Sequence, residues 1–467
     1  MATRIPQRPG GSTYQFRSTR GVEAIMRPVR IHGGMTRLLI AGGEVLMSSM
    51  ELLRADIVID QDTGLIEAIG PTVGETFAID RRLDATDAVV MPGLVNAHTH
   101  AAMTLFRGLA DDTPLDRWLR EDIWPIEAHL AAPAVRAGTE LAVVEMIRSG
   151  TTCFADMYFF MPTVAEVVDA WGMRAKLGRG VVTVGKDEAA ATDDIEASLS
   201  FAREYAGAAD GRIQTAFMPH SLTTVAPEML AWAVPAARDA GVDIHYHANE
   251  TTAEVTPIRE REGVVPLEYA AAQGMLEAGD FIAHGVHLDA AEIALLADAH
   301  VGVIHCPASN MKLASGMAPI QQLVDAGSTV GLGTDGAASN NDLDMFGEMR
   351  DAAMIGKLAA GDAAAMDAPS VLEIATIGGA VALGMPGGLI EVGAAADLAV
   401  VDLDAPHLVP RHDIVSHLVY AACGRDVRHT ICDGQVLMQD RRIPDVDVTG
   451  VCETAEARAI ELVEMAR

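Results

Sequence analysis

Two patterns of hydrophobic and polar positions occur along the chain, one at its two ends and another in its middle. From Leu38 to Ile69, short apolar runs alternate with turn residues, a pattern that is typical of β-hairpins. Similar runs return near the C-terminus, at 396–402 and at 429–438, the second with an Asp-Gly turn inside it. We therefore expect one small β-sandwich that both chain ends form together, with residues 35–91 and residues 386–445 as its two parts.

The middle of the chain, residues 92–385, alternates short β-type runs with alanine-rich helical stretches at 133–148, 227–240 and 290–299, among others. This alternation is typical of a parallel sheet whose strands are joined by helices. Eight strand–helix units predict an α/β fold, a (β/α)₈ TIM barrel, whose catalytic groups lie at the C-terminal strand ends. The eight predicted strands end near His98, Asp156, Arg179, His220, His247, His284, Ser309 and Asp335.

Two terminal segments fall outside these units. Residues 1–34 are rich in arginine and lack the apolar core of a signal peptide, so we expect a disordered extension, with Met35 as an alternative start. Residues 446–467 predict a helical C-terminal tail. The chain has no continuous apolar run long enough for a membrane span, so a membrane partner is not expected.

The charge balance narrows the possible partners. The chain carries 65 acidic against 34 basic residues, a net charge of −31. Phosphate contacts need a cationic face, so nucleic acid is not an expected partner. Such an acidic surface also suggests adaptation to high salt, because added ions screen its self-repulsion. The five cysteines are scattered without a C-x-x-C pair, which favours free thiols in a reducing, cytoplasmic compartment.

Candidate metal ligands occur at the C-terminal ends of the predicted strands. The first strand, taken as residues 89–100, carries His98 and His100, which face the same way because they are alternate strand residues. His247 ends the fifth strand and Asp335 ends the eighth. Three imidazoles and one carboxylate form a site suited to one divalent metal ion, with zinc favoured over iron or manganese.

Further polar residues accompany these ligands. Glu250 follows His247 by three residues, past the strand end, where it could approach a substrate. His284 ends the sixth strand. His245 is expected one layer deeper in the barrel, in a structural role.

No lysine stands at a candidate catalytic position, and Lys176 is interpreted as structural. A carboxylated lysine that bridges two metals is therefore not expected.

Two glycine-rich segments imitate nucleotide-binding motifs. Residues 331–336 match G-x-G-x-x-G, but they lie at the last barrel strand and no clear helix start follows, which argues against a dinucleotide site. Residues 180–186 resemble a phosphate loop, yet Asp187 stands where Ser or Thr must hold magnesium. The H-x-E…P-C-x-x-C signature of the zinc-dependent cytidine and adenosine base deaminases is also absent.

The motifs together resemble the amidohydrolase superfamily, and within it the 5′-methylthioadenosine/S-adenosylhomocysteine deaminase group, which includes archaeal 5′-deoxyadenosine deaminases. The resemblance spans about residues 35–438. Its most specific stretches are PGLVNAHTHAAMTLFRGLADD (92–112), GTTCFADMYFF (150–160), HGVHL (284–288), HCPASNMKLASGMAPI (305–320) and GTDGAASNNDLDMFGEMR (333–350). It implies a hydrolase that removes the exocyclic amino group of an adenosine-type nucleoside.

The resemblance also implies roles for the site residues. Glu250 corresponds to the proton-shuttling glutamate and His284 to the histidine that holds the attacking water. Glu127 matches the acid that grips the ribose hydroxyls, His220 matches a substrate-contacting histidine, and Arg179 an arginine near the substrate tail. The residues that bind the divalent metal are His98, His100, His247 and Asp335.

These roles imply a hydrolytic mechanism. A bound divalent metal lowers the pKa of its water to about 7. Asp335 takes the proton released as that water attacks C6 of the base, and Glu250 protonates ring N1. His284 orients the attacking oxygen and stabilises the adduct. Ammonia leaves, and the inosine analogue remains.

The chain departs from the group in two places. After Pro219-His220-Ser221, the group usually has Pro-Tyr-Thr, where this chain has Leu-Thr-Thr. Members that accept S-adenosylhomocysteine tend to carry a second arginine where residues 192–196 read Thr-Asp-Asp-Ile-Glu, which repels a carboxylate. We therefore expect smaller 5′-modified adenosines to be better substrates.

Two other functions remain open at this point. One is a different hydrolase of the superfamily, which deaminates guanine, cytosine or 8-oxoguanine, or hydrolyses an s-triazine. Glu127 discriminates against it, because a free base has no ribose to grip. The other is a scaffold that has lost its metal. We expect a homo-oligomer that takes a small nucleoside as its substrate.

Overall fold

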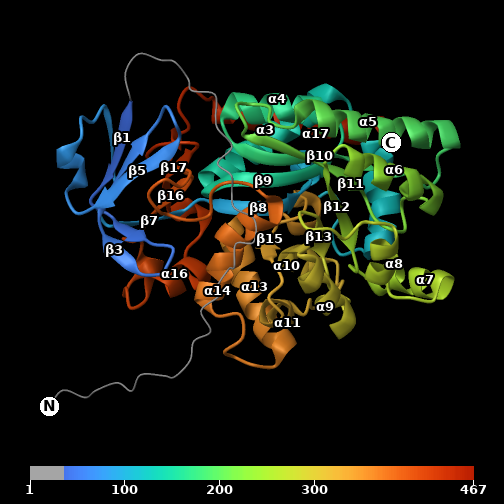
Figure 1. Ribbon diagram of the computed structural model, residues 1–467. Helices are drawn as coiled ribbons and strands as arrows, with labels where there is room; N and C mark the ends of the chain where they lie inside the picture. The colour runs from blue at the N-terminus through green and yellow to red at the C-terminus, as the bar shows by residue number, and fades with distance from the viewer. Residues whose placement is uncertain (1–35) are drawn as a thin grey trace.

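The structure is a computed structural model that describes residues 36–467, so the predicted extension at 1–34 and Met35 lie outside the described residues. Its centre is an eight-stranded parallel sheet surrounded by helices (Figure 1). The strands follow one another in chain order: β8 (Leu94–Thr99), β9 (Thr151–Tyr158), β10 (Arg174–Val181), β11 (Ile213–Pro219), β12 (Asp243–Ala248), β13 (Phe281–His284), β14 (Gly302–His305) and β15 (Val330–Leu332).

The first and last strands meet and nearly close the sheet into a barrel. The backbone N–H of Asp335 donates to the carbonyl of His98 at 2.9 Å, and the side chain of Asn96 accepts from the N–H of Thr334. Gly333 is required at this seam, because a Cβ there would lie 2.8 Å from the backbone nitrogen of His98. The predicted (β/α)₈ fold class is therefore confirmed.

Helices connect the strands and cover the outside of the barrel. Two are bounded by the local signals of the sequence: proline opens α6, and the Asp289 side chain accepts from the N–H groups of Ala291 and Glu292 at the start of α9. The helices after β8 are α1 (Leu115–Arg117), α2 (Trp124–Glu127), α3 (Ala132–Arg148), α4 (Met161–Trp171), α5 (Glu188–Tyr205), α6 (Pro227–Asp239), α7 (Thr252–Glu262), α8 (Pro266–Ala272), α9 (Ala290–Ala299), α10 (Pro307–Lys312), α11 (Ile320–Asp325), α12 (Ala337–Asn340), α13 (Met345–Ala360), α14 (Ala368–Glu373) and α15 (Gly379–Leu383).

Both chain ends contribute to two smaller sheets beside the barrel (Figure 1). The first has the order β5-β4-β1-β6, and the second has the order β18-β17-β16-β7-β2-β3. Their strands are β1 (Arg37–Ala41), β2 (Glu44–Leu46), β3 (Leu52–Arg54), β4 (Asp56–Asp60), β5 (Leu65–Gly70), β6 (Arg81–Asp84), β7 (Ala88–Pro92), β16 (Leu398–Asp402), β17 (Val427–Cys432) and β18 (Gln435–Met438). This is the expected sandwich from both ends, while the exact bounds of the predicted units stay a prediction.

Strand β7 separates two hydrophobic cores. Val90 packs between the two small sheets, whereas Val89 and Met91 pack in the large core around the barrel. Strand β16 alternates in the same way, with Val400 on the sandwich side and Val401 on the barrel side. Because successive strand residues point to opposite faces, the six-stranded sheet packs on the sandwich core with one face and on the barrel core with the other.

Three details differ from the sequence-based expectations. The single strand expected at 89–100 divides at Gly93 into β7 of the six-stranded sheet and β8 of the barrel, and a Cβ at Gly93 would overlap the side chain of Thr152. The seventh barrel strand ends at His305, and Ser309 lies in α10. A short helix, α12, does follow the 331–336 glycine segment, although its residues contribute to the metal-ligand region described below.

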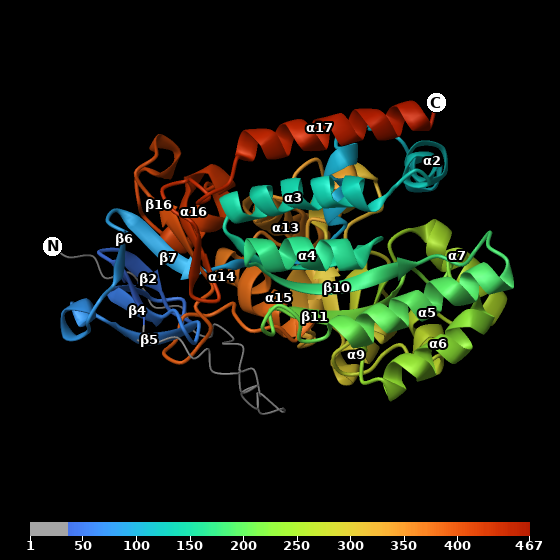
Figure 2. The same ribbon diagram turned by 90° about the horizontal axis from the view of Figure 1, so that it is seen from above.

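The C-terminal tail forms α17 (Val448–Met465), preceded by α16 (Ile414–Tyr420). Figure 2 shows α17 lying along α3 and reaching the region of α2, which it contacts. No helix among residues 36–467 is both long enough and apolar enough to cross a membrane.

Candidate metal centre and active-site pocket

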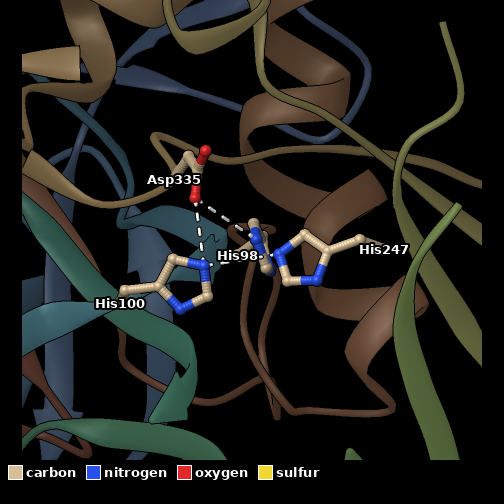
Figure 3. Close-up of side chains that lie close together, drawn as sticks. All are labelled: His98, His100, His247 and Asp335. Atoms are coloured by element: carbon tan, nitrogen blue, oxygen red, sulfur yellow. Dashed lines mark hydrogen bonds and ion pairs between the residues drawn. The ribbon is translucent and has the colours of Figure 1, made fainter. Parts of the chain in front are cut away.

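Four side chains from three strand ends converge at the mouth of the barrel. Ligand atoms of His98, His100, His247 and Asp335 all lie within 4.8 Å of one another (Figure 3). Asp335 Oδ1 lies 3.5 Å from His98 Nε2 and 3.2 Å from His100 Nε2, and the Nε2 atoms of His100 and His247 are 3.3 Å apart. A shift in the β8–β9 register between Asn96 and Thr99 accompanies this placement of the two β8 histidines.

The far nitrogen of each imidazole is held by a hydrogen bond. His100 Nδ1 contacts the carbonyl of Met157 at 2.6 Å, and His247 Nδ1 contacts that of His220 at 2.7 Å. A carbonyl only accepts, so both Nδ1 atoms carry a proton, and both rings direct Nε2 at the centre, where a metal would bind. This is the arrangement that histidine ligands need.

Asp335 is fixed from its other side. Its Oδ2 accepts hydrogen bonds from Ser309 Oγ at 2.7 Å and from Ser339 Oγ at 3.0 Å, while Oδ1 accepts from the N–H of Gly336. The two serines lie on α10 and α12, next to the last barrel strand. They leave Oδ1 directed at the imidazoles.

The electrostatics suit a cation at this point. Burial lowers the pKa of His98 to about 4 and holds that of His247 well below its usual value, so both are neutral ligands. Burial opposes ionisation of Asp335, yet the adjacent imidazoles of His100 and His98 keep its pKa well below its usual value. Burial likewise opposes protonation of His100, but Asp335 outweighs it and raises the pKa of His100 to about 9. A divalent metal would take the place of that proton.

One orphaned atom supports the fit to a metal. His98 Nε2 is buried and has no hydrogen-bond partner, which is costly unless an ion completes its environment. A second cluster, formed by His407, Cys423 and Asp426, lacks this feature. There, Asp426 Oδ2 already accepts from His407 Nε2 and from the N–H of Cys423, both at 2.9 Å. We therefore assign that cluster to hydrogen bonding.

Glu250 and His284 stand beside the four ligands. Glu250 Oε2 lies 3.8 Å from His284 Nε2, and Glu250 Oε1 accepts from Ser315 Oγ at 3.2 Å. His284 Nδ1 is 2.9 Å from Asn310 Oδ1. Burial raises the pKa of Glu250, partly offset by His284, so this carboxyl holds a proton more readily than a free glutamate.

Glu127 lies on α2 at the wall of the same cavity. Tyr158, the last residue of β9, donates its phenolic hydrogen to Glu127 Oε1 at 2.6 Å. Burial raises the pKa of Glu127, and the bond from Tyr158 counteracts the rise. Glu127 and the metal-ligand cluster therefore line one cavity, with Tyr158 fixing the carboxylate.

The cavity has a polar end and an apolar wall. It encloses about 720 Å³ including its open mouth. Its polar lining contains His100, His220, His247, Glu250 and His284 together with Glu127, Asp335 and Ser339. The apolar lining is formed largely by the segment between β8 and α3, with Leu115, Trp118, Leu119, Ile123 and Trp124. A flat heterocycle with an apolar substituent fits such a lining.

The chain is similar to a known protein family over most of its length. The model of the amidohydrolase family matches residues 89–437. The chain belongs to the amidohydrolase family. A 5-methylthioadenosine/S-adenosylhomocysteine deaminase from Natronomonas pharaonis is 60% identical over 92% of this chain and 99% of its own length. A 5'-deoxyadenosine deaminase from Methanosarcina mazei is 46% identical over 88% of this chain and 94% of its own.

A solved structure agrees with this placement. An adenosine deaminase from Xanthomonas campestris with bound zinc superposes with a TM-score of 0.87 and 38% identity, over 92% of this chain and 99% of that one. The present chain is thus a hydrolase of the amidohydrolase family that acts on C–N bonds.

Of two residues expected to contact the substrate of this amidohydrolase, one lines the cavity and the other does not. His220 lines the cavity, with its Nδ1 3.0 Å from Thr224 Oγ1. Arg179 points away from it: its guanidinium pairs with Asp194 of α5, which also binds Lys186. The inward position beside it on β10 is Gly180, because neighbouring strand residues face opposite sides. Arg179 is therefore not part of the described cavity lining.

Several residues at the site were given no functional role by the sequence analysis. Tyr158, Ser309, Asn310 and Ser315 each hold a candidate functional side chain through one hydrogen bond. All four lie within stretches that resemble the family: Tyr158 ends β9, and the other three lie in or just after α10. Their partners lie far along the chain, so only the folded structure pairs them.

Proposed function

We propose that this amidohydrolase is a deaminase of adenosine-type nucleosides, with 5′-deoxyadenosine and 5′-methylthioadenosine as preferred substrates. The observation that carries this proposal is the position of Glu127, held by Tyr158 in the wall of the cavity that is also lined by His100, His247 and Asp335. The relatives named as nucleoside deaminases support it.

The proposed centre holds one divalent metal ion, zinc in the first place. His98, His100, His247 and Asp335 would bind it, and the zinc in the adenosine deaminase neighbour supports this choice over iron or manganese. When bound, the metal supplies an activated water. The remaining chemistry falls to side chains of this chain.

Glu250 would deliver a proton to ring N1 of the base. Its raised pKa favours the protonated form that this step needs, and Ser315 holds its Oε1. His284, fixed by Asn310, would orient the attacking oxygen and donate to the developing oxyanion. Asp335 would accept one proton of the attacking water and pass it to the amino group, which leaves as ammonia. The remaining hydroxyl proton would return to Glu250 as the C6 carbonyl forms, which restores the protonated glutamate.

The 5′ group would meet an apolar surface. Among the described residues that line the cavity, none is lysine or arginine, and Arg179 and Lys186 both pair with Asp194 outside it. A methyl or methylthio group fits such a wall. The carboxylate of S-adenosylhomocysteine would lose hydration there without gaining a cation, so we expect it to be the weakest nucleoside substrate.

We further propose that the enzyme works in the cytoplasm as a homo-oligomer, in the salvage of by-products of S-adenosylmethionine chemistry. Its scattered cysteines and its acidic, lysine-poor composition are consistent with a reducing compartment and with partners other than nucleic acid.

An ammonia-release screen tests the proposed function. The purified protein, loaded in turn with Zn²⁺, Fe²⁺ and Mn²⁺, would be given adenosine, 5′-deoxyadenosine, 5′-methylthioadenosine, S-adenosylhomocysteine, guanine and cytosine at low and high salt. Release from the 5′-modified nucleosides supports the proposal. Release from guanine or cytosine alone would replace it with a base deaminase. A protein that binds no metal and gains nothing from adding one would be a scaffold.

A further inference from the structure

His98 differs from the other two proposed histidine ligands in what holds its far nitrogen. His100 and His247 are each held by a main-chain carbonyl, but His98 Nδ1 lies 2.9 Å from Nε2 of His245. His98 and His245 are both fully buried. One of the three ligands is therefore held by a side chain that can be substituted.

The hydrogen bonds fix where the protons lie in this pair. His245 Nδ1 contacts the carbonyl of Phe281 at 2.8 Å, and a carbonyl only accepts, so Nδ1 of His245 carries a hydrogen. The Nε2 of a neutral His245 is then an acceptor, and His98 Nδ1 must be the donor to it. His98 Nε2, the buried atom without a partner, is left with its lone pair directed at the metal centre.

His245 is itself held in place by its surroundings. Its ring stacks on that of Phe281, with centroids 4.0 Å apart and planes inclined by 11°. Lys176 Nζ lies 5.3 Å from the centre of the Phe281 ring and is anchored by Asp243 Oδ2 at 2.6 Å and by the carbonyl of Leu383 at 3.0 Å. The stacked Phe281 ring and the hydrogen bond to the Phe281 carbonyl therefore fix the direction of the His245 ring.

We propose that His245 is a positioning residue for the metal centre, which accepts a hydrogen bond from His98 and so fixes the tautomer and direction of that ligand. The inference rests on the proposed metal-binding role of His98. It gives His245 a function beyond the structural role expected from the sequence. Outer partners of this kind typically change metal affinity about 10- to 100-fold when removed.

Zinc affinity of three variants tests the proposal. His245→Phe keeps a planar ring but has no acceptor, and we expect its zinc affinity, measured by competition with a chelator, to fall about 10- to 100-fold. His245→Gln offers an amide oxygen to His98, so it should bind zinc more tightly than the Phe variant. His305→Phe is the matched control, because His305 is equally buried but its ring nitrogens have no partner. It should bind zinc as the wild type does.

The outcomes separate this inference from the proposed function. A folded His245→Phe protein with wild-type zinc affinity would overturn the positioning role, as would a Gln variant as weak as the Phe variant. Failure of the wild type itself to bind zinc would instead remove the proposed metal centre. Should the Phe variant not fold, nitrogen NMR of ¹⁵N-histidine in the metal-free wild type decides: His98 protonated on Nδ1 supports the role, and protonation on Nε2 refutes it.

Discussion

Tyr158 donates its phenolic hydrogen to Glu127 across 2.6 Å, and so joins the end of strand β9 to helix α2 in the wall of the active-site cavity. Tyr158 also lies next to the metal centre, with its ring 6.2 Å from that of His100. Through this pair, the position of the proposed ribose-binding carboxylate is set by the same strands that set the metal ligands.

Replacing Tyr158 by Phe should weaken nucleoside binding. Glu127 would lose the hydrogen bond that counteracts the effect of burial on its pKa, and it would become more protonated and less fixed. A hydrogen bond to a charged group contributes about 1.5–3 kcal/mol, so we expect KM for 5′-deoxyadenosine to rise at least about 10-fold. Steady-state kinetics with the zinc-loaded protein measures it.

Glu127→Ala serves as the comparison for that variant. It should raise KM for nucleosides much more than for free bases, since a base has no ribose to contact. Equal effects on both classes would indicate a base deaminase and would remove Glu127 from the ribose.

Glu250→Gln should retain the metal and lose most turnover. The amide keeps the size of the side chain and an acceptor for Ser315, but it has no proton to deliver to the base. General acid catalysis typically contributes about 10²- to 10⁴-fold, and we expect kcat to fall by that range. Metal analysis of the same sample is the control. A metal-loaded variant with near wild-type kcat would contradict the assigned role.

Asp335→Asn should lose both metal and activity. The substitution removes the negative charge that faces His98 and His100, and with it the electrostatic reason for a cation to bind there. After dialysis, we expect less than one metal ion per chain in the variant, against one in the wild type, together with a loss of activity. A chelator should abolish the activity of the wild type in the same way. Full metal content in the variant would argue against Asp335 as a ligand.

The free energy of unfolding should fall as pH rises from 4.5 to about 8, the range over which the pKa of Glu254 is shifted. This carboxyl is buried, its Oε2 accepts from the N–H of Glu250 at 2.9 Å, and its Oε1 has no partner. Burial raises its pKa from 4.5 to about 8. Between these values the folded state binds more protons than the unfolded state, so the free energy of unfolding decreases with pH, by at most about 5 kcal/mol.

Glu254→Gln removes this titration while it keeps an acceptor oxygen for Glu250. Urea unfolding at pH 5 and at pH 8.5 should therefore show a smaller decrease for the variant than for the wild type. Identical pH dependence in the two proteins would mean that Glu254 is ionised at neutral pH in the folded state.

Salt should stabilise the protein. A net charge of −31 produces repulsion that is stronger in the folded state, where the acidic residues are closer together, and added ions screen it. We expect the thermal midpoint to rise steadily with KCl. Sucrose at matched water activity controls for general exclusion effects. A midpoint that is equal in dilute buffer and in high salt would exclude an adaptation to salt.

Much of the architecture follows from local sequence signals. The helix bounds expected at 227–240 and 290–299 agree closely with α6 and α9, because the opening proline of α6 and the capping carboxylate of α9 act within a few residues. The polar residues at successive strand ends predicted one shared site, since parallel strands present their C-terminal ends at the same rim of a barrel. The four proposed ligands could be chosen for that reason.

Direction and pairing of side chains needed the fold itself. Only the tertiary structure showed that Arg179 turns outward to Asp194, that Tyr158 holds Glu127, and that His98 bonds to His245 across 147 residues of chain. A strand pattern places a residue at a rim, but its partner belongs to another strand or helix. Hydrogen bonds form between atoms brought within about 3 Å, and that proximity is created by the closure of the barrel.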